Sequence, residues 1–280
     1  MLIGNKKILN EMQILIDNNK CPQSVLLVGD NYFGKKYLAR HIADLIKKPF
    51  MFLGDSIQDF NEMKKEVYGH ANGFCYIITD LQNYNYKAIE SLLKIIEEPP
   101  KNTYFIITCN NEYRIKITIR NRCYILRMEM YQISDLIEYS EYKKYKKLDI
   151  WYYSNIVYTP TLIDFYSNGK LEQYEEFVKK FVNSISNVSA GNALKAANQF
   201  SMGKDDNDNI RFDLFLNFLS ALVLKNEQVF HKNIILILWC IRDYKNQYTI
   251  NGVDKLSLIK DFILKYRKIC IENGIDRITI

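Results

Sequence analysis

The spacing of apolar residues divides the chain into two regions. Up to about residue 128, short continuous apolar runs alternate with longer segments in which apolar residues recur every three to four positions. Such runs are typical of strands buried on both faces of a parallel sheet, and the longer segments are typical of amphipathic helices. The predicted strands are Val25–Val28, Phe50–Leu53, Phe74–Thr79, Tyr104–Ile107 and Cys123–Arg127. The pattern predicts an α/β domain in which helices cover a parallel sheet on both sides.

Beyond residue 128 the pattern predicts helices without strands. Short helices are expected over residues 129–204, and three long helices over about 211–224, 228–246 and 253–272. The polar stretch 202–209 has little that can be buried and predicts a linker. We therefore expect three domains, 1–128, 129–204 and 205–280. The longest apolar run, 234–241, is far shorter than the roughly 20 residues of a membrane span and predicts a buried core helix.

One predicted helix stops abruptly before the strand that begins at Tyr104. Ile89, Leu92 and Ile96 share a helical face, and Pro99 and Pro100 then follow two glutamates in the sequence EEPP. Proline cannot continue the helical hydrogen-bond ladder, so the helix has to end there. The break is either only a helix stop or a feature of a functional surface, and the local pattern leaves both interpretations open.

The composition is that of a globular protein, with 48% hydrophobic and 25% charged residues. A net charge of +6 is compatible with a polyanionic partner but does not require one. The six cysteines form no CxxC pair, and the three histidines are isolated, so we expect reduced thiols and no metal site. The N-terminus shows no apolar export signal, which predicts a cytoplasmic protein that does not interact with membranes.

A candidate phosphate-binding loop lies between the first predicted strand and the following helix. Gly29, Gly34 and Lys35 have the spacing GxxxxGK, in which backbone amides and the lysine bind phosphates. A working loop has Ser or Thr after the lysine to hold magnesium, whereas Lys36 is a cation that repels a metal. The loop therefore looks disabled, and whether ATP or magnesium still binds stays open. Solvation of Lys35 at a helix N-terminus is the alternative.

Asp80 follows the strand FCYIIT, where such ATPases place the acid that orients magnesium. Their next residue is usually the glutamate that activates water, but here it is Leu81, which performs no proton chemistry. This second deficit also predicts a loss of ATP hydrolysis. A structural role for Asp80 at the strand end is an equally good interpretation.

The segment 78–123, from ITDLQ through LLKIIEEPP to NRC, resembles bacterial DNA polymerase III clamp-loader subunits of the AAA+ class, of the delta-prime type related to gamma and tau. The resemblance is specific over about residues 20–128. It implies an AAA+ P-loop domain with a parallel sheet between helices, then a small helical lid and an all-α collar domain. The family's Ser-Arg-Cys motif corresponds to Asn121, Arg122 and Cys123, so the serine has changed.

The resemblance also implies roles for single residues. Arg122 would be an arginine finger that acts in trans on the nucleotide site of a neighbouring subunit, and Thr108 would be sensor 1. Gly29, Gly34, Lys35, Lys36 and Asp80 would be degenerate Walker residues. The lid segment YTPTLIDFYSNG lacks the family's second sensor arginine. The expected protein is a scaffold without intrinsic ATPase activity; an ordinary surface ion pair is the alternative for Arg122.

The expected partners are gamma/tau ATPase and delta subunits, and, through the assembly, the sliding clamp and primer–template DNA. Collar helices could pack on sister subunits through faces that include Phe215 and Phe262, although a self-contained three-helix bundle would bury the same residues.

Two other functions remain open. The chain could be an active ATPase with an unusual metal site, or it could bind the DNA backbone directly through Lys94, Lys101, Arg114 and Lys116.

Overall fold

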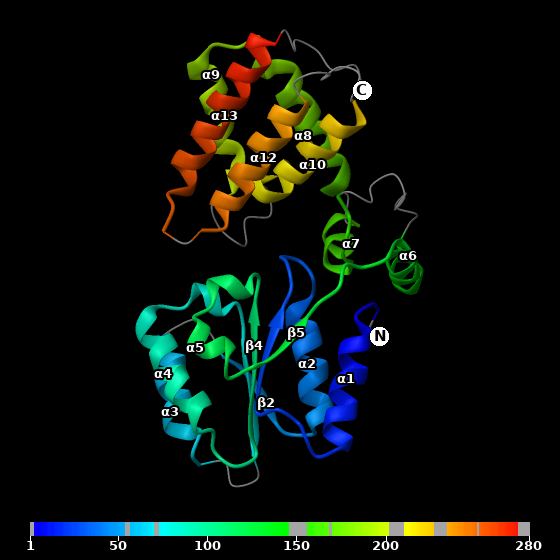
Figure 1. Cartoon of the computed structure of the whole chain (residues 1–280). Coiled ribbons are helices and arrows are strands. Elements are labelled where there is room, and N and C mark those ends of the chain that lie inside the picture. Colours follow the sequence, from blue (N-terminus) through cyan, green and yellow to red (C-terminus); the bar gives the residue numbers. More distant parts are fainter. Residues whose placement is uncertain are drawn as a thin grey trace. The chain divides into compact units, whose positions relative to one another are not determined.

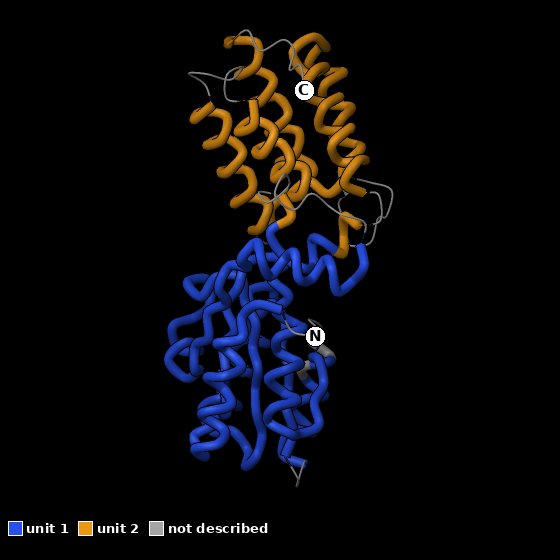
Figure 2. Tube along the Cα trace, turned by 90° about the vertical axis from the view of Figure 1, so that its right-hand side faces the viewer, with its two compact units in different colours: residues 1–151, 158–163 blue, residues 152–157, 164–280 orange. Residues whose placement is uncertain are grey.

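The computed structural model describes residues 3–53, 57–69, 73–145, 156–167, 170–201, 210–226, 234–250 and 252–273. The chain separates into two compact units. Unit 1 holds residues 1–151 and 158–163, and unit 2 holds residues 152–157 and 164–280 (Figure 2). Among the described residues, no helix is both long enough and apolar enough to cross a membrane.

Unit 1 is built from strands that alternate with helices (Figure 1). Its strands are β1 (Ser24–Val28), β2 (Phe50–Leu53), β3 (Phe74–Ile78), β4 (Thr103–Cys109) and β5 (Tyr124–Arg127). Its helices are α1 (Lys6–Asp17), α2 (Lys35–Ile46), α3 (Ile57–Glu66), η1 (Leu81–Asn83), α4 (Tyr86–Glu97), η2 (Glu112–Arg114), α5 (Ile117–Arg120) and α6 (Ile133–Tyr142). Helix α7 (Pro160–Tyr166) begins in unit 1 and ends in unit 2.

The five strands form one parallel sheet in the order β2-β3-β4-β1-β5. Helices α1 and α2 supply Met12 and Ile42 to the core on one face, and α3, α4 and α5 supply Met63, Leu92 and Ile119 to the core on the other. The central strands are therefore apolar on both faces, as a covered parallel sheet requires. The predicted parallel α/β sheet is confirmed.

Helix α4 ends at Glu97, directly before Glu98, Pro99 and Pro100, as predicted. The chain then enters β4, and the side chain of Gln23 donates hydrogen bonds to the carbonyl oxygens of Pro100 at 3.1 Å and Thr103 at 3.2 Å. Gln23 directly precedes β1, so these bonds hold the proline turn against the amino ends of the central strands.

Unit 2 is mainly helical. Its elements are α8 (Lys170–Ile185), α9 (Ala190–Lys195), η3 (Ala196–Gln199), β6 (Phe200–Ser201), β7 (Ile210–Arg211), α10 (Phe212–Lys225), α12 (Ile234–Tyr248) and α13 (Lys255–Glu272). Aromatic rings fill its core, with Phe215 in edge contact with Phe181 at 5.0 Å and with Phe200 at 5.0 Å between ring centroids. The phenylalanines of the helical pattern thus stabilise the unit itself.

Three sequence-based expectations for this region need correction. The short parallel pair β6–β7 shows that strands do occur after residue 128. Phe215 and Phe262 are fully buried inside unit 2, so these two side chains are not free for sister subunits. Phe215 contacts Phe181 of α8 as well as Phe262 of α13, so the bundle that buries them is larger than the three collar helices. The apolar run 234–241 is not wholly buried, because α12 packs on α10 and α13 through one face and exposes Ile235, Leu236 and Trp239 on another.

Some expectations are not tested by this structure. The predicted linker 202–209 and residues 228–233 of the second long helix lie outside the described residues. The division into two compact units does not test the domain boundaries predicted near residues 128 and 204. The three-domain division stays a prediction.

Candidate functional site

The candidate nucleotide site lies at the carboxyl edge of the sheet in unit 1. The loop from Gly29 follows β1, Asp80 is the second residue after β3, and Asn110 follows β4 directly. Since all strands are parallel, these three connections leave the sheet at the same edge. Open parallel sheets bind ligands at this edge, so the fold brings the predicted Walker residues together.

A side chain at either of the two loop glycines would meet a different obstacle. Gly34 has φ +74°, a left-handed conformation that disfavours a side chain. Gly29 has no such φ value, but a Cβ atom there would come within 2.9 Å of the sulfur of Met128. Between them, the hydroxyl of Tyr131 donates a hydrogen bond of 2.9 Å to the carbonyl oxygen of Phe33. Burial raises the pKa of Tyr131 to about 12, which keeps this donor protonated.

Lys35 folds back into the loop. Its ammonium donates to the carbonyl oxygens of Gly29 at 2.8 Å and Asp30 at 3.0 Å, and to the side-chain oxygen of Asn110. The carboxylate of Asp80 lies 3.8 Å from the same nitrogen. A lysine ammonium has three N–H groups, so its donors are fully used by these acceptors.

The environment of Lys35 excludes the alternative of a simply solvated side chain. Only 8% of the residue is exposed. Burial lowers the pKa of Lys35, while the carboxylate of Asp80 acts in the opposite direction. Lys35 is therefore an internal connection between the loop, β3 and β4.

The two residues that break the ATPase pattern lie in opposite environments. Lys36 is exposed in the first turn of α2, next to the loop. Leu81 is fully buried in the core between the sheet and helices α3 to α5. A glutamate at position 81 would have to enter this apolar core, at a high desolvation cost. The packing around Leu81 therefore disfavours a water-activating acid at this position.

Thr108 and Asn110 lie at the carboxyl end of β4 and make different contacts. The hydroxyl of Thr108 is fully buried and accepts a hydrogen bond of 2.9 Å from the backbone amide of Asp80. Asn110 instead contacts Lys35, and its amide group donates to Asn31 at 2.7 Å. Sequence reasoning missed Asn110. Its position directly after β4, at the same edge as Gly29, was the available signal.

Arg122 lies away from this site. It precedes β5, and Tyr124 of β5 pairs with Val25 near the start of β1, whereas Gly29 follows the end of β1. At about 3.3 Å per residue, roughly 15 Å of strand separates the two positions. The guanidinium of Arg122 contacts Glu97 at 2.7 Å and the carbonyl oxygen of Thr118 at 2.8 Å. The structure thus contains the surface ion pair that was the alternative for this residue.

The four candidate DNA contacts do not form one patch. Arg114 and Lys116 follow the carboxyl end of β4, whereas Lys101 precedes the amino end and Lys94 lies in the last turns of α4. Lys116 sits over the ring of Tyr86, 3.5 Å from its centroid, and Arg120 lies 5.4 Å from that of Tyr113. We call Tyr86, Tyr113, Arg114, Lys116 and Arg120 the basic-aromatic surface.

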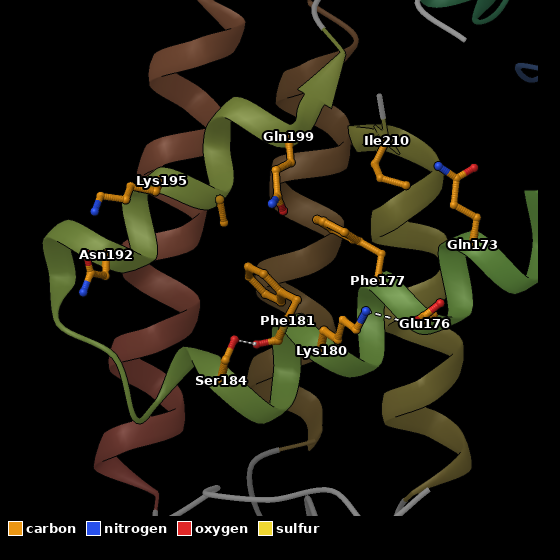
Figure 3. Close-up of a pocket in the computed structure, with 11 residues that line it drawn as sticks. Gln173, Glu176, Phe177, Lys180, Phe181, Ser184, Asn192, Lys195, Gln199 and Ile210 are labelled. Carbon is orange, nitrogen blue, oxygen red and sulfur yellow. Dashed lines mark hydrogen bonds and ion pairs between the residues drawn. The ribbon is translucent and has the colours of Figure 1, made fainter. Parts of the chain in front are cut away.

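Unit 2 contains a separate cavity of about 640 Å³ beside α8 (Figure 3). Phe177 and Phe181 line it, and Lys180, which pairs with Glu176 at 2.6 Å, lies at its edge. Asn192 and Lys195 of α9 line it from the other side. It contains none of the predicted site residues.

Comparison of the sequence with known proteins identifies DNA polymerase III subunits as similar. A family model described as DNA polymerase III, delta subunit, matches residues 54–132. The chain is also 21% identical over 238 residues to DNA polymerase III subunit delta′ of Buchnera aphidicola; the alignment covers 83% of this chain and 65% of that protein. The chain is similar to DNA polymerase III subunits of the delta-prime type. The resemblance carried by residues 78–123 is therefore confirmed.

Two solved structures share the fold of this chain. A DNA polymerase III gamma subunit-related protein of Thermotoga maritima is 14% identical with a TM-score of 0.50, over 93% of this chain and 98% of that chain. The RuvB Holliday junction branch migration motor of the same organism is 15% identical with a TM-score of 0.51, over 97% and 85%. The predicted AAA+ architecture, an α/β P-loop sheet followed by a helical region, is confirmed.

Proposed function

We propose that this chain is a delta-prime-like subunit of a replicative clamp loader, without ATPase activity of its own. In this proposal Arg122 is an arginine finger for the nucleotide site of a neighbouring ATPase subunit. The observation that carries the proposal is the position of Arg122 at the amino edge of the sheet, far from its own P-loop. An arginine there is too far away to contact its own chain's nucleotide, so any nucleotide that it contacts belongs to another subunit.

The P-loop supports the absence of ATP hydrolysis. The donors of Lys35 are used by Gly29, Asp30 and Asn110, so a phosphate would have to replace at least one of these bonds. Hydrogen bonds to a charged group stabilise by roughly 1.5–3 kcal/mol each, so a phosphate has to compete with these acceptors for the lysine. Lys36 adds a positive charge where magnesium would be coordinated, and Leu81 supplies no base.

The trans role is tested in an assembled loader in which only the neighbouring ATPase site is intact. Arg122→Ala should lower phosphate release at that site by about 10³-fold, because an arginine finger stabilises charge on the transferred phosphoryl group. Lys87→Ala is the control, since Lys87 is an exposed cation on α4. Unchanged phosphate release from a normally assembled loader that carries Arg122→Ala would contradict the proposal.

The proposed partners are gamma/tau-type ATPase subunits and a delta subunit, acting together in the cytoplasm on the sliding clamp and primer–template DNA. Within unit 2, Ile235, Leu236 and Trp239 form the surface that supports contact with another subunit. Large apolar side chains grouped on one helix face are characteristic of protein interfaces. We call these three residues the α12 face.

Direct contact with DNA is a second proposal, and the basic-aromatic surface favours it. The segment 113–128 contains five arginine and lysine residues and no acidic residue. Cations contact the nucleic-acid backbone, and exposed rings such as Tyr113 can stack on unpaired bases. Binding of DNA by the isolated chain, measured over a range of salt concentrations, tests this proposal, and no binding at low salt would remove it.

A further inference from the structure

The guanidinium of Arg122 is held by two groups from different helices. Its Nη2 atom pairs with the carboxylate of Glu97, the last residue of α4, at 2.7 Å. Its Nη1 atom donates to the carbonyl oxygen of Thr118 in α5 at 2.8 Å. Two contacts that diverge from the same planar group fix its orientation as well as its position.

This arrangement leaves part of Arg122 available. A guanidinium has five N–H groups, and the two contacts use two of them. The side chain is 38% exposed, so the remaining donors can reach a ligand outside the chain. A long, flexible side chain that is already oriented loses less conformational freedom when it binds a phosphate.

The backbone of Glu97 is held by its neighbours, although its side chain is 39% exposed. Ile95 and Ile96, the residues before it, are each 4% exposed in the core beneath α4. The prolines that end the helix are fixed in turn by the hydrogen bond from Gln23 to Pro100 at 3.1 Å. Glu98, the next residue, has left the helical conformation, with φ −130° and ψ 69°. Only the first glutamate of the EEPP sequence therefore extends from the helix toward Arg122.

We propose that Glu97 is the positioning residue of Arg122, orienting its guanidinium toward the nucleotide of the neighbouring subunit. This inference rests on the proposed function of Arg122 in trans. It gives the EEPP sequence a role beyond ending a helix, because the prolines fix the carboxylate that orients the arginine. Glu97 touches no substrate and acts only through Arg122.

The test uses the complete assembled loader, with only the neighbouring ATPase site intact. Glu97→Gln keeps the size of the side chain but removes its charge, and we expect kcat for phosphate release to fall about 10-fold, with KM for ATP unchanged. Glu98→Gln is the matched control and should behave as the parent complex. Assembly of each complex is checked by size-exclusion chromatography, so that loss of the subunit is not mistaken for loss of orientation.

A double-mutant cycle separates positioning from a structural role. In a chain that already carries Arg122→Ala, Glu97→Gln should cause no further fall in kcat. A further fall would overturn the inference, as would an unchanged or raised kcat for Glu97→Gln alone. If Arg122→Ala lowers kcat but Glu97→Gln does not, only the role of Glu97 fails. If Arg122→Ala has no effect, the proposed function fails and the inference fails with it.

Discussion

The ammonium of Lys35 lies 3.8 Å from the Oδ1 atom of Asp80, which joins the loop after β1 to the end of β3. In an active P-loop protein, the corresponding lysine contacts phosphates and the corresponding acid orients magnesium. In this chain the two groups instead belong to one internal network with Asn110. This network is consistent with the proposal that the chain does not hydrolyse ATP.

The network predicts that Asn110 stabilises the fold. Asn110→Ala removes an acceptor from the buried ammonium of Lys35, and we expect the free energy of unfolding to fall by about 1–3 kcal/mol. Urea unfolding followed by circular dichroism measures the change. Asn121→Ala, at an exposed position, is the control and should change stability by less than about 0.5 kcal/mol. Equal stability of the parent chain and Asn110→Ala would contradict the account.

A second prediction concerns the pH dependence of stability. Arg127 donates two hydrogen bonds of 2.8 Å to the carboxylate of Glu112, and these bonds lower the pKa of Glu112. A lowered pKa in the folded state stabilises the protein above the unfolded pKa of glutamate, and this contribution disappears as the pH falls through the folded pKa. Glu112→Gln should therefore cost about 1 kcal/mol near neutral pH.

The measurement is the unfolding free energy of both chains from about pH 7 to about pH 3. The difference between the parent chain and Glu112→Gln should shrink as the parent carboxylate is protonated. A difference that stays constant over this range would show that the ion pair is not its cause.

The α12 face should matter for assembly rather than for folding. Trp239 is 64% exposed, so Trp239→Ser removes little buried area from the isolated chain, and its melting temperature should change by no more than a few degrees. In a complex that buries Trp239, the same change should weaken the subunit contact by about 2 kcal/mol or more. Ile14→Ser, at a 60% exposed position on α1, is the control. Equal affinity of Trp239→Ser and parent chains for the partner would exclude this face.

The basic-aromatic surface makes a prediction that separates the candidate DNA contacts. Lys116→Ala should reduce the slope of log affinity against log salt by about 1, because one phosphate contact is lost. Lys101→Ala should leave the slope unchanged, since Lys101 lies at the opposite edge of the sheet. If both substitutions reduce the slope equally, DNA contact is not confined to the carboxyl edge.

The strands of unit 1 were predictable because each is a continuous apolar run bounded by polar residues. The end of helix α4 at Glu97 could also be predicted from the sequence, since the effect of Pro99 and Pro100 is local. In contrast, the half-exposed state of α12 could not be inferred from the apolar run 234–241. Ile235 and Ile237 have the same side chain, and only the packing of α12 on α10 and α13 determines which of them is buried.

The candidate site was predictable where a local pattern or the sheet topology determines it. Gly34 and Lys35 are recognisable by spacing, and their convergence with Asp80 follows from a parallel sheet. The contact of Asn110 with Lys35 and that of Glu97 with Arg122 join residues from separate elements, so they depend on side-chain directions that no local pattern specifies. The proposed roles of Thr108 as sensor 1 and Arg122 as a finger remain predictions.

The central claim is that this chain does not turn over ATP, and it is tested most directly with the purified full chain. ATP and ADP are titrated calorimetrically with and without magnesium, and phosphate release is then measured over a long incubation. We predict no magnesium-dependent gain in affinity and no phosphate release above a blank without protein. Binding that strengthens with magnesium and is followed by sustained phosphate release would contradict the account and identify the chain as an active ATPase.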